Sequence, residues 1–367
     1  MSSREAAGDP VRRRRSGTRS VTLQDVAAIA GVSAQTVSRV LRIPDEVSPE
    51  TRDRVRTALR EAGYVPNLSA RNLASNRSKI VATVIPSLSA SVFSETLTGL
   101  SSVLAPEGYQ LLLGYTDYDD KREEELIRSL LGRRPDGFFM TGALHSPAVI
   151  KMLKASRVPV VETWDWIDTP LDTLVGFSNE DAMYAMVSSL HEAGYRAPCF
   201  VGSLLEGDHR SRRRLDGYLR AVGTYWPGRE PRVVDASAYP LALESGARLL
   251  EVARQAHPES DVLVFSTDIY ANGALLAATS RGIAVPEEIA VAGFGDFELS
   301  RMLRPALTTV ALPNTTIGQE AARMLLTRMR GERPERTKVD MGFEIRRRPR
   351  PRQAPGVRRS RGGGSRT

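Results

Sequence analysis

The sequence has little of the chemistry that stabilises small secreted folds or builds metal centres. A single cysteine among 367 residues, Cys199, excludes a disulfide framework and a four-thiolate metal site, and the four histidines lack metal-ligand spacing. No apolar run approaches the roughly 18 residues of a membrane span, and no apolar stretch suited to secretion follows the N-terminal arginines. We therefore expect a cytoplasmic protein with no structural metal, no cofactor and no membrane partner.

Positive charge is concentrated at the two ends of the chain. The net charge is +8, yet residues 346–367 contain nine arginines and no acid, while residues 80–345 are net negative. Arginine, glycine and proline cannot bury apolar surface, so residues 1–19 and 346–367 are expected to be disordered tails. Such tails are either simply solvated or attracted without sequence preference to the phosphates of DNA.

Residues 20–65 show the pattern of three short helices. A hydroxyl side chain suited to N-capping precedes each apolar segment; these residues are Thr22, Ser33 and Ser48. Asp25 completes a capping box in the first helix, and Gly31 can supply the left-handed turn between the first two helices. Two helices joined by a tight glycine turn predict a helix-turn-helix DNA-binding domain.

The second of these helices is the candidate recognition helix, whose side chains would contact base pairs. Opposite its apolar face it carries short or hydrogen-bonding side chains, namely Ala34, Gln35, Ser38 and Arg39. Arginine, glutamine and small polar groups are what contact with base edges in a major groove requires. Small helical bundles that bind no DNA share this pattern, so the pattern alone leaves both interpretations open.

Several motifs point to one family. In the first 67 residues they are VTLQDVA (21–27), GVS (31–33), TVSRVL (36–41) and GYVPN (63–67); further along they are GFSN (176–179), STD (266–268), GF (293–294) and RPALTTV (304–310). Through them the chain resembles the LacI/GalR family of bacterial transcription regulators over residues 20–345. Within that family, IPSL (85–88), VVE (160–162), Asp165, LD (171–172) and VGF (175–177) resemble the gluconate-operon repressors.

The resemblance implies which residues contact DNA. In the first domain they are Thr22, Leu23, Ser33, Ala34, Gln35, Thr36, Ser38 and Arg39, and in a hinge at 66–79 they are Asn67, Ala70 and Leu73. The hinge is expected to fold into a short helix only on its operator, which agrees with a polar, cationic segment too short to be stable alone. Leu73 would enter the minor groove and kink the duplex, or else it packs beneath the linker.

Residues 80–345 alternate between short apolar runs and amphipathic segments. We predict strands at 80–86, 109–114, 136–140, 158–162, 197–201, 262–265 and 289–294, and helices at 92–104, 123–131, 149–153, 182–191, 215–222, 241–256 and 272–281. This alternation predicts parallel sheets, and the length favours two α/β lobes with a ligand between them. The resemblance implies a core like that of periplasmic sugar-binding proteins, with crossings near 177–179, 308–312 and 340–343.

An arginine cluster is the clearest candidate for ligand binding. Arg210 and Arg214 would share one face at the start of a helix, where guanidinium groups form an anion site. The resemblance implies a role in effector binding, with Arg214 as the stronger candidate and Arg210 as the next. Arg212 and Arg213 are expected to be solvated surface charges. Gly295 stands where the family often has an aspartate, which favours an acidic ligand unless Asp296 reaches the pocket instead.

Other side chains complete the expected effector site. Phe93, Trp164 and Trp166 would supply an apolar wall, and Thr267 and Asp268 would bind hydroxyl groups. The full set of expected effector-binding residues is Ser87, Phe93, Trp164, Asp165, Arg210, Arg214, Thr267, Asp268 and Asp296. Either Trp164 or Trp166 could equally be a core residue.

These patterns together predict a nucleoid-associated homodimeric repressor that binds palindromic operator DNA and responds to a sugar acid such as gluconate. A ketogluconate, a neutral sugar or a phosphorylated sugar are alternative effectors. From other classes, a sugar-binding transport protein and an α/β enzyme remain as alternatives. The enzyme is disfavoured because strand 80–86 runs into a serine-rich turn without a dinucleotide fingerprint, and no G-x-S-x-G motif is present.

Overall fold

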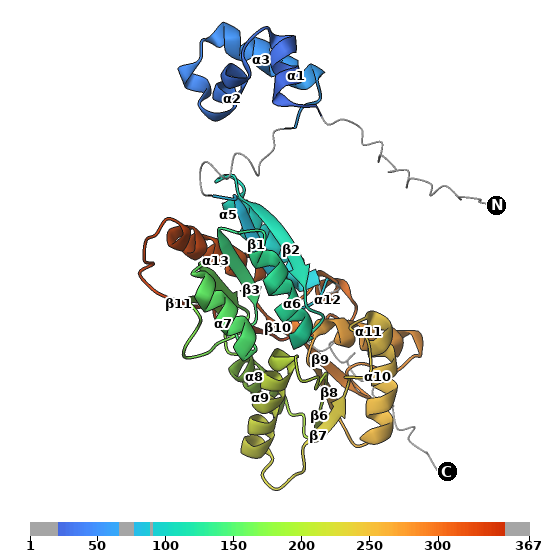
Figure 1. Cartoon of the computed structure of the whole chain (residues 1–367). Helices are drawn as coiled ribbons and strands as arrows, with labels where there is room; N and C mark the ends of the chain where they lie inside the picture. Colours follow the sequence, from blue (N-terminus) through green and yellow to red (C-terminus); the bar gives the residue numbers. More distant parts are fainter. Residues whose placement is uncertain (1–20, 66–76, 89–90, 349–367) are drawn as a thin grey trace, which may run out of the picture. The chain divides into compact units, whose positions relative to one another are not determined.

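The computed structural model describes residues 21–65, 77–88 and 91–348 of the chain (Figure 1). The chain divides into two compact units, Met1–Asn76 and Arg77–Thr367, and each is described by itself. None of the helices in the described ranges is long and apolar enough to cross a membrane.

The first unit is a bundle of short helices. It contains α1 (Leu23–Ala30), α2 (Ala34–Arg42), the 3₁₀ turn η1 (Pro44–Glu46) and α3 (Pro49–Glu61). Thr22 and Asp25 form the predicted capping box, and Gly31 adopts a φ of 64° in the turn between α1 and α2. The core consists of small apolar side chains: Val26, Ala27, Ala30, Val37, Val40, Val55 and Ala58. The predicted helix-turn-helix is confirmed.

The second unit contains two lobes, each built on a six-stranded sheet. In lobe 1 the strand order is β11-β5-β4-β3-β1-β2, and every pair is parallel. Its strands are β1 (Ile80–Ile85), β2 (Gln110–Tyr115), β3 (Gly137–Thr141), β4 (Val160–Thr163), β5 (Thr173–Gly176) and β11 (Lys338–Asp340). The helices packed on this sheet are α5 (Ser91–Leu104), α6 (Asp120–Leu131), α7 (Pro147–Ser156) and α13 (Asn314–Met329).

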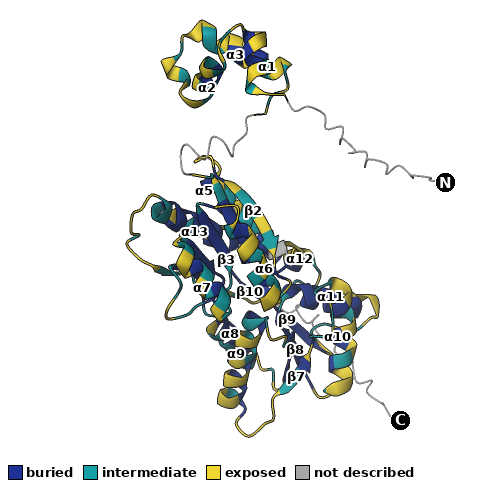
Figure 2. Ribbon diagram, in the orientation of Figure 1, coloured by how far each residue is buried: buried dark blue, intermediate teal, exposed yellow. Residues whose placement is uncertain are grey.

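Lobe 2 repeats this architecture. Its strand order is β12-β10-β9-β8-β6-β7, with β12 antiparallel to β10 and the other pairs parallel. The strands are β6 (Pro198–Gly202), β7 (Arg232–Asp235), β8 (Val262–Phe265), β9 (Ala290–Gly295), β10 (Thr308–Ala311) and β12 (Glu344–Arg346). The helices are α8 (Asn179–Glu192), α9 (His209–Tyr225), α10 (Leu243–Ala256), α11 (Asp268–Ser280) and α12 (Glu298–Met302). Buried strands lie between helices whose outer faces are exposed (Figure 2).

Three segments connect the lobes. The chain passes from one sheet to the other after β5, after β10 and between β11 and β12, at residues 177–178, 312–313 and 341–343. A row of aromatic rings runs through this region: Phe93, Trp164, Phe177 and Phe294 have consecutive centroids 5.4, 5.9 and 6.3 Å apart. These contacts between aromatic rings pack the two lobes against each other where the chain passes between them.

The structure corrects the expected ends of the core. Backbone N–H groups of Ser78 and Lys79 donate to Asp136 over 2.8 and 3.0 Å, so residues 77–79 belong to lobe 1 rather than to the hinge. At the other end, β12 begins an ordered segment where a disordered tail was expected from residue 346. Arg347 donates to Ser189 Oγ over 2.6 Å, and Arg348 donates to the buried carboxylate of Asp296 over 2.9 Å.

Several elements escaped prediction. Strands β5, β7, β10, β11 and β12 have only three or four residues each, and polar or charged residues interrupt the continuous apolar run that marks β8. Helix α13 is buried on more than one face, which weakens its amphipathic pattern. Helix α9 begins at His209, six residues before its predicted start, because Asp208 caps it.

Gly217 on α9 permits close packing against α8. A Cβ there would lie 2.1 Å from the Glu180 carbonyl oxygen, whereas a Cβ at Gly223 on the same helix meets nothing within 4 Å. Gly217→Ala should therefore lower the free energy of unfolding of the core by about 1–3 kcal/mol through overpacking. Gly223→Ala should raise it by about 0.5–1 kcal/mol through helix propensity. Urea unfolding followed by circular dichroism checks both, and equal effects would contradict this packing.

The C-terminal arginines should stabilise lobe 2. Removing residues 346–367 deletes two of the arginines that face buried Asp296, so the free energy of unfolding should fall by about 1–3 kcal/mol. Removing only residues 349–367 leaves those contacts in place and should change it little. Thermal denaturation of the two truncated chains distinguishes the outcomes; equal melting temperatures would show that the Asp296 contacts do not stabilise the fold.

Candidate functional site

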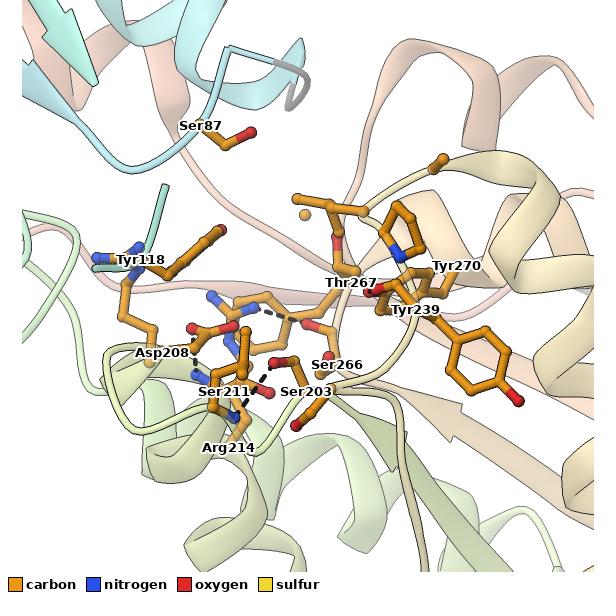
Figure 3. Close-up of a pocket in the computed structure, with 18 of the residues that line it drawn as sticks. Ser87, Tyr118, Ser203, Asp208, Ser211, Arg214, Tyr239, Ser266, Thr267 and Tyr270 are labelled. Carbon is orange, nitrogen blue, oxygen red and sulfur yellow. Dashed lines mark hydrogen bonds between the residues drawn. The ribbon is translucent and has the colours of Figure 1, made fainter. Parts of the chain in front are cut away.

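A cavity of about 620 Å³ lies between the two lobes (Figure 3). Most of its lining follows the carboxyl ends of strands, where parallel α/β sheets bind ligands. Lobe 1 contributes Ser87, Phe93, Asp117, Tyr118 and Trp164, and lobe 2 contributes Ser203, Asp208, Arg210, Ser211, Arg214, Ser237, Tyr239, Ser266, Thr267, Tyr270, Phe294, Gly295 and Phe297, among others. The cavity therefore joins one charged helix start to many hydroxyl groups and several aromatic rings.

Arg214 is held firmly within α9. Its Nε donates to Asn179 Oδ1 over 2.9 Å and its Nη1 donates to the Ser266 carbonyl over 2.6 Å. The guanidinium also lies 3.7 Å from the centroid of the Phe294 ring. Burial lowers the pKa of Arg214 to about 10, which leaves it cationic at neutral pH. Pre-oriented in this way, the guanidinium can bind an anion with little loss of side-chain entropy.

Arg210 lies one turn earlier, in the first turn of α9. The residue is buried, and its Nη1 donates to the Thr141 carbonyl over 3.2 Å. Asp208 caps the same helix by accepting from the Ser211 N–H over 3.2 Å. Burial raises the pKa of Asp208, against the lowering effect of Arg210 and Arg214. Two guanidinium groups beside the carboxylate of Asp208 leave an excess of positive charge at the helix N-terminus, while Asp117, the other carboxylate of the lining, lies 3.5 Å from Arg122.

The other two arginines of the cluster lie outside the cavity lining. Arg212 is exposed and donates from Nε and Nη2 to the Leu204 carbonyl, each over 3.3 Å, and Arg213 is exposed. Both positions agree with the expectation that they are solvent-facing charges.

Asp268 and Asp296 were expected in the effector site but are not among the residues that line the cavity. Asp268 accepts from Ser300 Oγ and Thr309 Oγ1, each over 2.6 Å, and from the Phe297 N–H over 3.0 Å. Burial raises the pKa of Asp268 to about 6 in spite of these hydrogen bonds. Its carboxylate therefore ties together the chain segments of lobe 2 instead of binding hydroxyls of a ligand.

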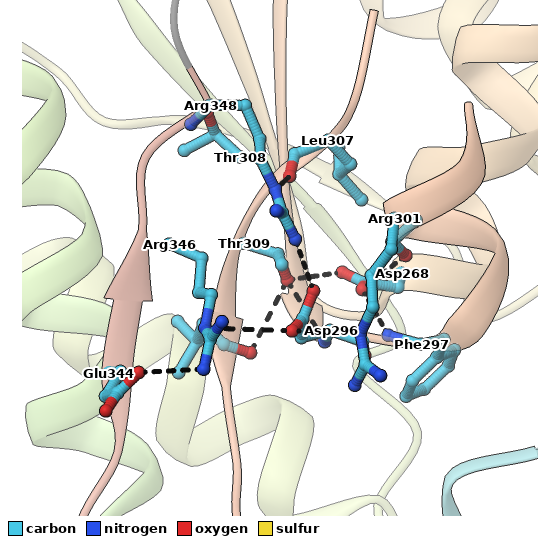
Figure 4. Close-up of polar contacts among 12 residues, drawn as sticks. Asp268, Asp296, Phe297, Arg301, Leu307, Thr308, Thr309, Glu344, Arg346 and Arg348 are labelled. Atoms are coloured by element: carbon cyan, nitrogen blue, oxygen red, sulfur yellow. Dashed lines mark hydrogen bonds and ion pairs between the residues drawn. The ribbon is translucent and has the colours of Figure 1, made fainter. Parts of the chain in front are cut away.

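Asp296 is likewise directed into the protein. Its carboxylate lies 3.2 Å from Arg301 Nε, 2.9 Å from Arg348 Nη2 and 3.9 Å from Arg346 Nε (Figure 4). The preceding residue, Gly295, faces the cavity with a φ of 132° that only glycine adopts readily. In this structure the carboxylate of Asp296 therefore faces three arginines and not the cavity.

Asp165 lines a second, smaller cavity of about 40 Å³. Its Oδ1 accepts from the Trp166 N–H over 2.9 Å, while its buried Oδ2 has no hydrogen-bond partner among the described residues. Arg210 and Tyr118 line both cavities and separate them. Of the nine expected effector residues, the structure thus brings six to the main cavity: Ser87, Phe93, Trp164, Arg210, Arg214 and Thr267.

Sequence reasoning missed much of the lining. Tyr118, Ser203, Asp208, Ser237, Tyr239 and Tyr270 line the cavity but were not predicted to do so. Ser203 lies two residues after the predicted strand 197–201, so its position near a strand end was a usable signal. The other five residues lie in a turn, after a strand that was not predicted or near a helix start that was not predicted. Predicted strand ends therefore gave no signal for them.

The expected DNA-contacting residues of the first unit are accessible. Gln35 and Arg39 are exposed on α2, and Ser38 and Ala34 are partly exposed. Thr22 and Ser33 use their hydroxyl groups as helix caps, and Leu23 and Thr36 are partly buried beside them. The expected hinge contacts Asn67, Ala70 and Leu73 lie outside the described residues.

A buried ionic cluster adjoins the small cavity. His145, whose side chain is 3% exposed, lies 2.8 Å from Glu123 Oε1 through Nδ1 and 3.4 Å from Glu162 Oε1 through Nε2. Burial by itself would lower the pKa of His145, but the hydrogen bond with Glu123 and the ion pair with Glu162 outweigh it and raise the pKa to about 9. The imidazolium therefore compensates two carboxylates that lie in the interior of lobe 1.

This cluster should make the stability of the core depend on pH. Because the folded-state pKa of His145 exceeds its unfolded value, the stabilisation is complete below about pH 6.5 and is lost as pH rises through about 9. The free energy of unfolding of the natural chain should exceed that of His145→Gln by an amount that falls by roughly 3 kcal/mol over this window. Urea unfolding at several pH values measures it, and a constant difference would contradict the assignment.

A helix-turn-helix unit joined to a two-lobed core with a polar cavity defines a ligand-responsive DNA-binding regulator. Comparison with known proteins supports this class. The family model for bacterial regulatory proteins of the lacI family matches residues 22–67, and the model for a periplasmic binding protein-like domain matches residues 187–348.

Individual relatives cover most of the chain. It is 38% identical over 327 residues to the HTH-type transcriptional regulator GntR of Pseudomonas aeruginosa, with 88% of this chain and 94% of that protein covered. It is 34% identical over 329 residues to the regulator IdnR of Escherichia coli, with coverage of 89% and 97%. The chain therefore belongs to the LacI family and is a DNA-binding transcriptional regulator, not an enzyme.

Solved structures show the same architecture. A LacI family regulator from Silicibacter pomeroyi shares 38% identity and a TM-score of 0.82, with 89% of this chain and 98% of that chain covered. The lac repressor dimer bound to operator and the anti-inducer ONPF shares 27% identity and a TM-score of 0.73, with coverage of 90% and 99%.

Proposed function

We propose that this regulator is a repressor whose two copies bind a palindromic operator and release it when a gluconate-like sugar acid binds between the lobes. The observation that carries the proposal is the pair of guanidinium groups, Arg210 and Arg214, at the N-terminus of α9 inside the cavity. A carboxylate is the natural partner of such a pair. The surrounding serine, threonine and tyrosine hydroxyls suit a polyhydroxylated chain.

The charge of the cavity favours an acid over a neutral sugar. A neutral ligand would leave the excess positive charge of the helix start uncompensated in a partly desolvated site, which is costly. Relatives named GntR and IdnR, together with the sequence resemblance to gluconate-operon repressors, support the same class of effector. A ketogluconate satisfies the same charge requirement and stays an alternative.

For DNA, the proposal assigns base reading to α2. Gln35 and Arg39 would contact base edges in the major groove, and Asn67, Ala70 and Leu73 would act in the minor groove from the hinge. The lac repressor structure, which is a dimer bound to operator, supports a homodimer on two half-sites.

Operator affinity measured with and without effector tests the proposal. A duplex selected by the protein from random sequences provides the operator, and fluorescence anisotropy gives the Kd. Saturating gluconate should weaken binding at least about tenfold, which requires a preference of only about 1.4 kcal/mol for the released state. An unchanged Kd with gluconate and ketogluconates would contradict the effector class, and failure to select any duplex would contradict specific DNA binding.

The substitution Arg214→Gln should separate effector binding from operator binding. It removes a cavity charge without touching the first unit, so effector affinity should fall at least about 30-fold, the effect of losing roughly 2 kcal/mol of charge-assisted bonding. Operator affinity without effector should stay within about twofold of the natural protein. Arg213→Gln, which changes an exposed arginine on the same helix, is the matched control and should leave both affinities unchanged.

A further inference from the structure

The two lobes touch across the cavity at a second place, away from the three crossings. Gly207, in the loop between β6 and α9 of lobe 2, lies directly against the Tyr118 carbonyl of lobe 1, and a Cβ at Gly207 would be 2.0 Å from that oxygen. Its φ lies outside the left-handed region, so space and not backbone conformation requires the glycine. The lobes can approach this closely only because residue 207 has no side chain.

Arg210 makes the neighbouring contact between the lobes. From the first turn of α9 it donates Nη1 to the Thr141 carbonyl at the end of β3, and its guanidinium lies 5.9 Å from the centroid of the Tyr118 ring. Gly142 leaves room for it, since a Cβ there would lie 3.0 Å from Nη1. Thr141 is the last residue of β3, so the position of the carbonyl that accepts from Arg210 is set by the sheet.

Arg210 differs from Arg214 in what it connects. The hydrogen bonds of Arg214 end on Asn179 at the start of α8 and on Ser266 after β8, both in lobe 2. Arg210 instead reaches lobe 1 while it also lines the cavity. A ligand carboxylate held by Arg210 is therefore connected to the opposite lobe through one side chain.

We propose that Gly207 and Arg210 form a clasp that closes the lobes over the ligand, and that Arg210 is the positioning residue through which effector binding becomes lobe closure. The inference rests on the proposed effector site. An anion that binds Arg210 keeps the guanidinium oriented toward Thr141 and favours the closed arrangement. The effector binds that arrangement more tightly, and by linkage it shifts the population of the protein toward it.

The first experiment measures lobe closure directly. The substitutions Lys151→Cys on α7 and Glu251→Cys on α10, both at exposed positions, provide sites for a pair of fluorophores. Cys199 is protected from labelling because it is buried and burial raises the pKa of its thiol to about 12. Energy transfer between the dyes reports the distance between the lobes in the full-length protein. Gly207→Ala should lower the transfer without any ligand, because the added methyl holds the lobes apart, and Gly223→Ala should not.

The second experiment measures coupling. Gluconate affinity of Gly207→Ala should fall about tenfold, and at saturating gluconate the ratio of operator Kd values with and without effector should move toward one. Arg210→Gln should show the same loss of coupling, with Arg212→Gln as its control because Arg212 donates to the Leu204 carbonyl of its own lobe. Arg210→Lys, which keeps the charge but not the planar fork, should restore part of the affinity and little of the coupling.

The outcomes separate the two proposals. Unchanged energy transfer in Gly207→Ala overturns the clasp whatever the effector is. If energy transfer falls as expected but gluconate and ketogluconates fail to bind the natural protein, the clasp stands and the sugar-acid effector is wrong. If Gly207→Ala does not fold, Arg210→Gln decides: a response to effector that matches the natural protein overturns the clasp.

Discussion

The placement of two arginines at the buried start of α9 is the constraint around which the cavity is arranged. A guanidinium held away from water must be compensated, and the surroundings of Arg214 supply an amide oxygen, a carbonyl and an aromatic face. Arg210 finds its carbonyl only in the opposite lobe. The same electrostatic requirement that calls for an anionic ligand therefore also links the two halves of the core.

A contact that links the two lobes can change their relative arrangement because each lobe is itself rigid. Helix pairs within each lobe approach so closely that a Cβ at Gly99 would lie 2.1 Å from the Thr315 carbonyl and one at Gly246 would lie 2.1 Å from the Tyr270 carbonyl. Packing this tight leaves little room for change inside a lobe. Relative motion is then concentrated at the crossings and at the contacts across the cavity, where small differences in ligand binding can shift the arrangement of the whole core.

Local patterns were sufficient for much of this structure. The capping box at Thr22 and the glycine turn at Gly31 predicted the first unit because both act within a few residues, and the apolar runs predicted the long central strands. The edge strands β7, β11 and β12 escaped because charged residues interrupt their short apolar runs. Arg210 and Arg214 were found because both lie on one helix, whereas Tyr118 and Tyr239 reach the cavity from turns that carry no such pattern.

The sequence by itself determined the kind of protein: a helix-turn-helix unit, parallel sheets in two lobes and a cationic helix start, all encoded by spacing and composition along the chain. Only the tertiary structure decided which charges face the ligand. Asp268 and Asp296 read as ligand groups, yet folding brings Thr309, Arg301 and Arg348 to them and makes them internal. Thr309 and Arg348 lie 41 and 52 residues along the chain from the carboxylates that they contact, and only folding brings them within hydrogen-bond distance.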